Sequence, residues 1–218
     1  MTEPDHATAL AEALLQINAI RLSPQKPFTW ASGLRSPVYC DNRLLLSYPD
    51  LRLIAIDGLI QIARQFGHID AIAGVATAGI PHGMLLADRL GLPFIYIRSK
   101  AKAHGKGNQI EGDCHPGQRV LVIEDLISTG GSSLQAAEAL QDAGLTVLGV
   151  AALFTYGFPE SRERFEAAGI PLQTVSNYER ILQVALQKGA INETESLTLS
   201  TWHQDPRAWS EHFVAHHA

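Results

Sequence analysis

The segment VLVIEDLISTGGSS, residues 120–133, constrains the fold of this chain more than any other part of it. Its first four residues are apolar and mostly β-branched, which predicts a strand covered on both faces inside a parallel sheet. We expect this strand to end at Glu124 and Asp125. A helical pattern follows the next loop as far as Gly144, a predicted C-cap. The segment therefore predicts a strand, a loop and a helix.

The predicted loop has the composition of an anion-binding loop. Glycines let the backbone approach a ligand, hydroxyls add donors, and free N–H groups at the start of a helix favour a phosphate. The two preceding carboxylates suit the hydroxyls of a ribose. A P-loop is excluded because no lysine follows Gly130 or Gly131, and the dinucleotide G-x-G-x-x-G spacing is absent. An ordinary βα turn with solvated acids is the alternative, and two adjacent acids just ahead of S-T-G-G-S, separated from it by Leu126 and Ile127, disfavour it.

Strands and helices are predicted to alternate along the rest of the chain, with a βαβ rhythm in the middle. Residues 28–41 are predicted to form a hairpin or hood, and residues 77–81 a turn that leads into a helix ending near Leu90. The other predicted helices are 7–20, 49–66, 159–168 and 177–187, and the other predicted strands are 69–76, 93–98, 146–154 and 172–175.

Composition predicts one globular domain that does not bind nucleic acid or a membrane. The 218 residues are 46% hydrophobic and 18% charged, with a formal net charge of −5. That charge gives no general attraction to nucleic acid or an anionic membrane. The N-terminal sequence lacks a signal-peptide pattern, so we expect a cytoplasmic location. Cys40 and Cys114 lie far apart and predict neither a disulfide framework nor a zinc site.

Residues 99–117 interrupt the strand and helix pattern. This segment is rich in glycine, lysine and histidine and has almost no apolar residues. A loop of this length inside a compact domain is usually a lid or is disordered. Because the segment lies between two predicted core strands and next to a predicted phosphate site, we expect a basic, mobile lid.

Three segments of the chain resemble the orotate phosphoribosyltransferases, a branch of the type I phosphoribosyltransferases. FTWASGLRSPVYCDNR, residues 28–43, resembles the hood of that family, and IRSKAKAHGKGNQIEG, residues 97–112, matches the R-x-x-x-K-x-H-G pattern of its catalytic loop. Residues 120–133 resemble the phosphoribosyl pyrophosphate signature. The resemblance implies the type I fold: a mainly parallel α/β sheet flanked by helices. Within a single domain, 1–218, it implies a hood near 1–45 joined by the C-terminal tail, a core near 46–190 and a lid near 99–117.

The resemblance also implies a reaction. Orotate would attack C1 of phosphoribosyl pyrophosphate, giving orotidine 5′-monophosphate and pyrophosphate in the synthesis of UMP. Mg²⁺ would be held mainly by pyrophosphate and water, with no direct protein ligand. A homodimer is implied, with lid residues acting at the partner's site.

The site residues implied by the resemblance fall into three groups. Lys102, His104 and Asp125 are expected to be catalytic, and Ser128 is expected to contact orotate. Arg35 has two expected roles of equal weight: it contacts orotate's carboxylate, or it caps the hairpin. The residues expected to bind phosphoribosyl pyrophosphate are Arg98, Lys102, His104, Glu124, Asp125, Leu126, Ile127, Ser128, Thr129, Gly130, Gly131 and Ser132.

The chain departs from one well-known branch of the family at Ala31, Ala78 and Ser99, where that branch has lysine. It also lacks that branch's arginine after the strand that ends near Phe154. Another branch is therefore indicated, with base contacts less defined than phosphate contacts. A phosphoribosyltransferase for another base, and a regulator that binds phosphoribosyl pyrophosphate, are the alternatives.

The aromatic and histidine residues near the C-terminus predict packing rather than chemistry. His203, His212, His216 and His217 lack zinc-ligand spacing and are expected to be solvated on a terminal helix. Trp202 and Trp209 are expected to anchor that tail.

Overall fold

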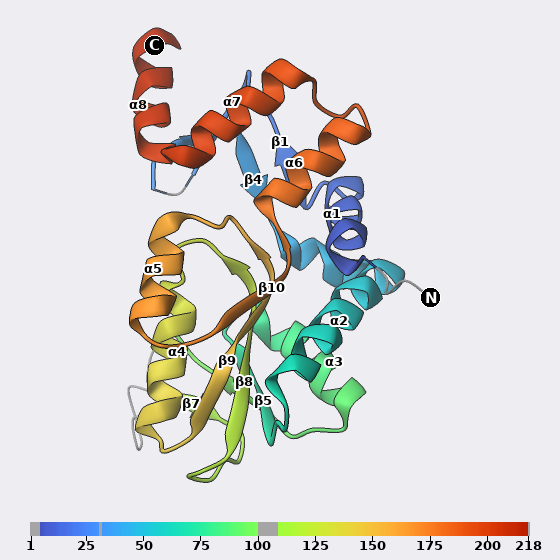
Figure 1. Cartoon of the computed structure of the whole chain (residues 1–218), viewed down its shortest axis with the longest axis vertical. Helices are drawn as coiled ribbons and strands as arrows, with labels where there is room; N and C mark the ends of the chain where they lie inside the picture. Colours follow the sequence, from blue (N-terminus) through green and yellow to red (C-terminus); the bar gives the residue numbers. More distant parts are fainter. Residues whose placement is uncertain (1–4, 31, 100–108, 218) are drawn as a thin grey trace.

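The computed structural model describes residues 5–30, 32–99 and 109–217 and shows an α/β fold built on a six-stranded sheet (Figure 1). The strand order is β10-β9-β8-β5-β6-β7, and every neighbouring pair is parallel except β6 and β7. These strands are β5 (Ala71–Val75), β6 (Phe94–Ile97), β7 (Ile110–Glu111), β8 (Arg119–Ile127), β9 (Thr146–Thr155) and β10 (Leu172–Asn177). The predicted fold class is confirmed.

Strand β8 lies inside the sheet and is covered on both faces, as its apolar run predicts. Leu121 and Ile123 face one buried cluster, whereas Val120 and Val122 face the other. This alternation follows from the period of two residues in a strand. Both clusters are closed to water, so β8 provides a rigid base for the segment that follows it.

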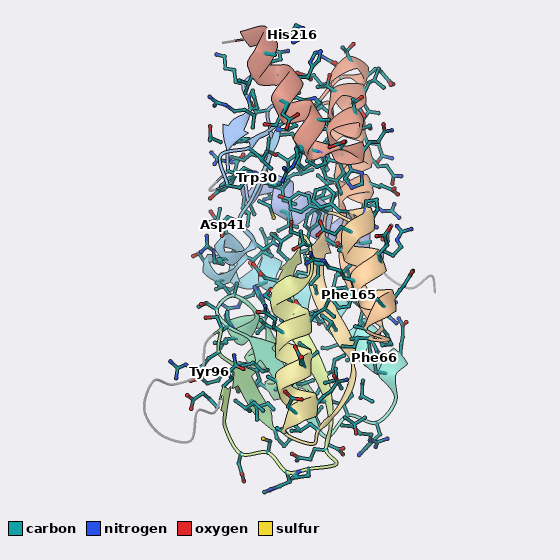
Figure 2. All side chains as sticks on the ribbon, turned by 90° about the vertical axis from the view of Figure 1, so that its left-hand side faces the viewer. Trp30, Asp41, Phe66, Tyr96, Phe165 and His216 are labelled. Atoms are coloured by element: carbon teal, nitrogen blue, oxygen red, sulfur yellow. The ribbon has the colours of Figure 1, made fainter. Side chains whose placement is uncertain are left out.

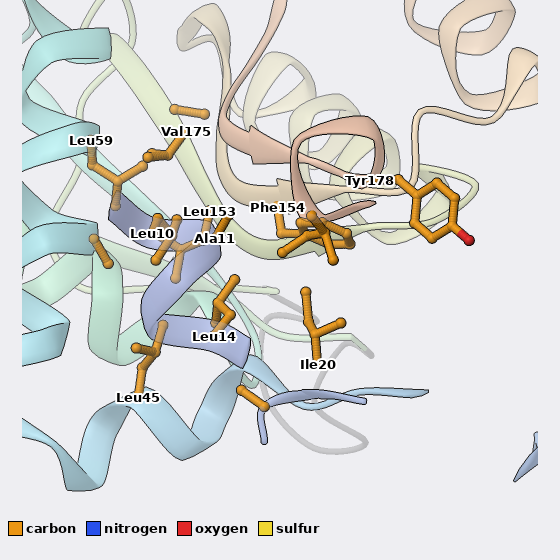
Figure 3. Close-up of a cluster of buried hydrophobic side chains, with 14 of the residues drawn as sticks. Leu10, Ala11, Leu14, Ile20, Leu45, Leu59, Leu153, Phe154, Val175 and Tyr178 are labelled. Atoms are coloured by element: carbon orange, nitrogen blue, oxygen red, sulfur yellow. The ribbon is translucent and has the colours of Figure 1, made fainter. Parts of the chain in front are cut away.

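Helices cover the two faces of the sheet in separate groups. The first face packs against α1 (His6–Gln16), α2 (Pro49–Ala63) and α3 (Gly79–Leu90), and Figure 3 shows Leu10 and Leu14 of α1 pointing toward Leu153 of β9. The second face packs against α4 (Gly131–Asp142) and α5 (Pro159–Ala167). The short 3-10 helices η1 (Asn42–Ser47) and η2 (Arg64–Phe66) flank α2.

At one end of the molecule, two small antiparallel strand pairs, called the hood below, lie beside the C-terminal helices, called the tail (Figure 1). Strand β1 (Ile20–Leu22) pairs with β4 (Val38–Cys40), and β2 (Phe28–Thr29) pairs with β3 (Arg35–Ser36). Helices α6 (Tyr178–Gln187), α7 (Glu193–Gln204) and α8 (Pro206–His217) complete this end of the molecule. The Ser210 hydroxyl on α8 accepts a hydrogen bond of 2.8 Å from the backbone N–H of Arg35, which attaches the tail to the hood.

Several predicted boundaries need correction. The first helix ends at Gln16, because Asn18 adopts φ 56° and turns the chain into β1. The tail is two helices instead of one, because Pro206 starts α8 directly after Asp205. Part of the predicted lid, Ile110–Glu111, is strand β7 on the edge of the sheet, and Gln109 accepts a hydrogen bond of 2.9 Å from the N–H of Arg98.

No helix in the part of the chain that the structure describes is long and apolar enough to span a lipid bilayer.

Candidate active site

Both candidate carboxylates lie within β8, whereas the sequence predicted that the strand would end at them. Pairing between β8 and β9 continues to Ile127 and Thr155, so Leu126 and Ile127 also belong to the strand. The anion-binding loop is therefore only Ser128 to Gly130, followed by α4. The prediction failed here because the acids interrupt the apolar pattern while the backbone remains extended.

Glu124 is buried and is held by three donors. Its side chain accepts hydrogen bonds from the hydroxyls of Ser132 and Ser133, both at 3.3 Å, and from the N–H of Asp125 at 3.1 Å. Only 5% of the residue is exposed. Burial, together with the nearby negative charge of Asp125, raises the pKa of Glu124 to about 8. Glu124 is thus fixed in place, and its carboxyl group binds a proton more tightly than an ordinary glutamate does.

Asp125 directly follows Glu124 in β8 and is more accessible than Glu124. Burial raises the pKa of its carboxyl group, and the hydrogen bond to Glu124 and the positive charge of Arg43 oppose that shift. Its backbone carbonyl accepts a hydrogen bond of 2.9 Å from the side-chain amide of Asn42. The two acids of the pair therefore have different surroundings and can have different roles.

The loop after β8 has the shape of an anion cradle. Gly130 has φ 77°, and a Cβ atom there would lie 2.5 Å from the ring of Phe165, so a glycine is needed on both grounds. The hydroxyl of Thr155 donates a hydrogen bond of 3.2 Å to the Ile127 carbonyl and fixes the start of the loop. Free N–H groups at the N-terminus of the 12-residue helix α4 then face the loop.

A second turn and an arginine lie beside this loop. Residues 76–78 connect β5 to α3, and Gly79 brings α3 so close to β8 that a Cβ atom would lie 2.3 Å from the Ile123 carbonyl oxygen. Arg98 at the end of β6 makes an ion pair of 3.5 Å with Glu111. A hollow of about 40 Å³ lies between the turn after β5, the end of β6 and the start of α4. The residues that line it are Val75, Ala76, Ile97, Arg98, Ser99, Gln109, Ser132, Gln135 and Ala136. Arg98 and Ser132, two predicted ligands distant in sequence, thus share one hollow.

The remaining predicted residues have varied positions. Lys102 and His104 lie outside the described residues, as does Ala31. Arg35 donates a hydrogen bond of 2.7 Å to the hydroxyl of Thr29 across the β2–β3 hairpin. This contact is the one expected if Arg35 caps the hairpin. Ala78 directly precedes α3, and Ser99 is exposed at the rim of the hollow.

An aromatic cluster joins the hood and tail to the end of β9. Trp202 is fully buried, as predicted, and its ring lies against those of Trp30, Tyr156, Phe158 and Tyr178. The prediction that His203 is solvated is wrong. It is half-buried, stacks on Tyr178 with ring centroids 4.6 Å apart, and forms a hydrogen bond through Nε2 with the carbonyl of Tyr156. Spacing alone could not show this, because its partners lie 25 and 47 residues away.

The site offers oxygen donors but no closed protein cage for a cation. Glu124 and Asp125 are adjacent carboxylates, and Glu124 is already engaged by two hydroxyls and an N–H group. Among the described residues, no three His, Cys, Asp or Glu side chains gather closely enough to hold a metal ion. Such a site fits a Mg²⁺ ion that takes its ligands mostly from substrate phosphates and water.

Comparison with known proteins identifies the family. A model of the phosphoribosyl transferase domain matches residues 47–188. An orotate phosphoribosyltransferase of Bacteroides thetaiotaomicron is 55% identical over 200 residues, which cover 91% of this chain and 94% of that protein. This chain belongs to the orotate phosphoribosyltransferase family. Among solved members, the structure from Aeropyrum pernix has a TM-score of 0.73 and 34% identity, covering 84% of this chain and 99% of the other.

A further family member shows the fold with a ligand. The Mycobacterium tuberculosis orotate phosphoribosyltransferase, solved in complex with phosphoribosyl pyrophosphate, has a TM-score of 0.66 and 26% identity, covering 82% of this chain and 99% of the other. The family assignment confirms the resemblance drawn from the three sequence segments.

Proposed function

We propose that this protein transfers the phosphoribosyl group of phosphoribosyl pyrophosphate to orotate, giving orotidine 5′-monophosphate and pyrophosphate. The supporting observation is the junction of β8 and α4, where two carboxylates near the end of one strand are followed, after Leu126 and Ile127, by a short glycine and hydroxyl loop and a helix N-terminus. This junction has the groups required for a ribose and a phosphate. Its location at the carboxyl end of a parallel strand is where ligands bind in open α/β sheets.

Asp125 is the proposed catalytic carboxylate. Displacement at C1 passes through a ribose that bears positive charge while the leaving pyrophosphate gains negative charge, so preorganised charges can stabilise both. Asp125 would accept hydrogen bonds from a ribose hydroxyl and face the positive sugar. Glu124, with its raised pKa and fixed by two serines, would hold the neighbouring hydroxyl and the shape of the strand end.

The loop and the start of α4 would bind the 5′-phosphate. Ser128, Thr129 and Ser132 would supply hydroxyl donors, while Gly130 and Gly131 would supply accessible N–H groups. Leu126 and Ile127 would contribute as the strand residues that aim this loop. Ser128 would also contact orotate, with Arg35 as the open alternative for the carboxylate.

The pyrophosphate would lie toward the end of β6. Arg98 borders the hollow that also contains Ser132 and the turn after β5. Lys102 and His104 would neutralise the leaving group, and His104 would donate a proton to it, because the pKa of an unperturbed histidine lies near neutrality. Bound Mg²⁺ would supply further neutralisation of the pyrophosphate charge.

A homodimer is the proposed assembly. Four large apolar side chains on η1, α2 and α3 or between them are unusually exposed, namely Leu44, Tyr48, Leu53 and Met84, with exposures of 40 to 47%. Exposed apolar side chains that gather into one patch mark an interface in many soluble proteins, and these four are the proposed contact residues. Lys102 and His104 would then act at the partner's site. We place the reaction in the cytoplasm, since its highly charged substrate does not cross membranes unaided.

Replacement of the catalytic carboxylate tests this function. Asp125→Asn keeps the shape of the side chain but removes the charge that faces the ribose. We expect the rate of orotate consumption to fall about 10²-fold, the usual effect of losing one preorganised electrostatic contact. The melting temperature should stay close to that of the wild-type protein. An unchanged rate would instead support a simple βα turn with solvated acids.

A further inference from the structure

Asn42 connects the hood to the candidate active site, although no sequence pattern pointed to it. It is 1% exposed and begins η1, directly after the hood strand β4. Its side-chain Nδ2 donates a hydrogen bond of 2.9 Å to the main-chain carbonyl of Asp125, a residue 83 positions away. In Figure 2 the neighbouring Asp41 lies where the hood meets the core.

The contact falls where the sheet stops supporting β8 on one side. Pairing between β5 and β8 ends at Gly74 and Ile123, because the chain turns away after β5 toward α3. The Asp125 carbonyl lies beyond that point. A buried carbonyl needs a donor, and the Asn42 amide provides one in the place of a neighbouring strand.

Neighbouring groups hold the Asn42 amide in a single orientation. The thiol of Cys40 donates to Oδ1 of Asn42 at 3.2 Å, so the amide nitrogen faces Asp125. Burial raises the pKa of the Cys40 thiol, which therefore stays protonated and able to donate. The two chain neighbours of Asn42 also bond to each other, since Asp41 accepts hydrogen bonds from the Arg43 guanidinium at 2.6 and 2.9 Å. A rotated amide would lose both of its contacts.

We propose that Asn42 is a positioning residue for phosphoribosyl transfer, which links hood strand β4 to Asp125 and fixes the direction in which the Asp125 carboxylate meets the ribose. The inference rests on the ribose role proposed for Asp125. Asn42 holds the main chain of Asp125 from the side that β5 has left, while pairing with β9 holds β8 from the other side. A movement of the hood therefore reaches the ribose site through one hydrogen bond.

The main test compares Asn42→Ala with a matched control, Ser176→Ala, in the full-length protein. Ser176 is also 1% exposed, and its hydroxyl donates a hydrogen bond of 2.9 Å to the Ala7 carbonyl, far along the chain from the site. Both variants lose one side-chain bond to a carbonyl, and Asn42→Ala also loses the bond from the Cys40 thiol, so it should lose somewhat more stability. We expect only Asn42→Ala to weaken phosphoribosyl pyrophosphate binding by calorimetry and to lower kcat, giving about a tenfold loss in kcat/KM. Equal kinetics for the two variants would overturn the proposal.

A second variant tests whether the hydrogen-bond donor of the Asn42 side chain is itself required. Asn42→Asp keeps the shape but donates a hydrogen bond only when the new carboxyl group is protonated, and burial raises the pKa of such a group. The ratio of its kcat/KM to that of the wild-type protein should therefore rise as the pH is lowered from about 8 to about 6. A constant ratio would contradict a positioning role for the hydrogen bond.

Asp125→Asn, measured in parallel, separates this inference from the function on which it rests. Impaired turnover in Asp125→Asn together with wild-type kinetics in Asn42→Ala would overturn the inference about Asn42 alone. Wild-type kinetics in Asp125→Asn would remove the ribose role and the inference with it.

Discussion

At the scale of single residues, Glu124 gives the protein without substrate an unusual dependence on pH. Burial raises its pKa to about 8 from an ordinary value of 4.5. Between these values the folded protein binds a proton that the unfolded chain has released, so a rising pH lowers the free energy of unfolding. A carboxyl group with a lowered pKa would have the opposite effect.

The prediction is clearest above neutral pH, where histidine no longer titrates. We expect the melting temperature of the substrate-free protein to fall between about pH 7 and pH 8.5. The free energy of unfolding should fall by at most about 1.4 kcal/mol per pH unit. Glu124→Gln should flatten this decline, because glutamine has no proton to lose. Scanning calorimetry of both proteins in matched buffers checks it, and equal slopes would show that Glu124 titrates normally.

His82 predicts a separate effect on the acid side. It is fully buried on α3, and neither ring nitrogen has a hydrogen-bond partner among the described residues. Burial lowers its pKa to about 4 from 6.5. Between these values the unfolded chain binds the additional proton, so the wild-type protein should lose stability as the pH falls. The free energy of unfolding of His82→Leu, measured by urea titration, should fall less over this pH interval than that of the wild-type protein. An equal fall in both proteins would contradict a buried, neutral His82.

At the scale of elements, the loop between β8 and α4 depends on one glycine. Gly130→Ala would place a Cβ atom 2.5 Å from the Phe165 ring and force φ 77° on an alanine. We expect a loss of about 2 to 3 kcal/mol in the free energy of unfolding and a higher KM for phosphoribosyl pyrophosphate. The control is Gly91→Ala, with φ 65° and no atom within 4 Å of the added carbon. Gly91→Ala should lower the free energy of unfolding by only about 1 kcal/mol. Equal losses in the two variants would show that the Phe165 ring moves aside freely.

The elements also show what the sequence could and could not predict. The β-branched run of β8 and the glycines of its loop specify a local structure, so the sequence predicted both the strand and the loop. The end of β8 depends on pairing with β9, and the place of Asn42 depends on a contact across 83 residues. The position of His203 could not be predicted for the same reason, since Tyr178, on which it stacks, begins α6 and the carbonyl that it contacts belongs to Tyr156, just after β9. Local patterns contain no signal for such contacts.

At the scale of the whole molecule, the proposed assembly predicts complementation between two inactive variants. Lys102→Ala and Asp125→Asn are each expected to be nearly inactive. If Lys102 acts at the partner's site, a mixed dimer has one site with both groups intact and one with neither. Equal mixtures, unfolded and refolded together, should then recover about a quarter of wild-type activity, because half of the dimers are mixed. No recovery, with mixed dimers verified by mass spectrometry, would show that Lys102 acts within its own subunit.

The most direct test of the account is the choice of base. Purified protein would be given phosphoribosyl pyrophosphate and Mg²⁺ with orotate, uracil, adenine, hypoxanthine or guanine, and consumption of each base would be followed by absorbance. We expect orotate to be the only one of these bases that is consumed, and no consumption without Mg²⁺. Turnover with another base would contradict orotate as the acceptor and leave the proposed phosphoribosyl pyrophosphate site in place. Tight binding of phosphoribosyl pyrophosphate without turnover of any base would contradict catalysis itself and favour a regulatory protein.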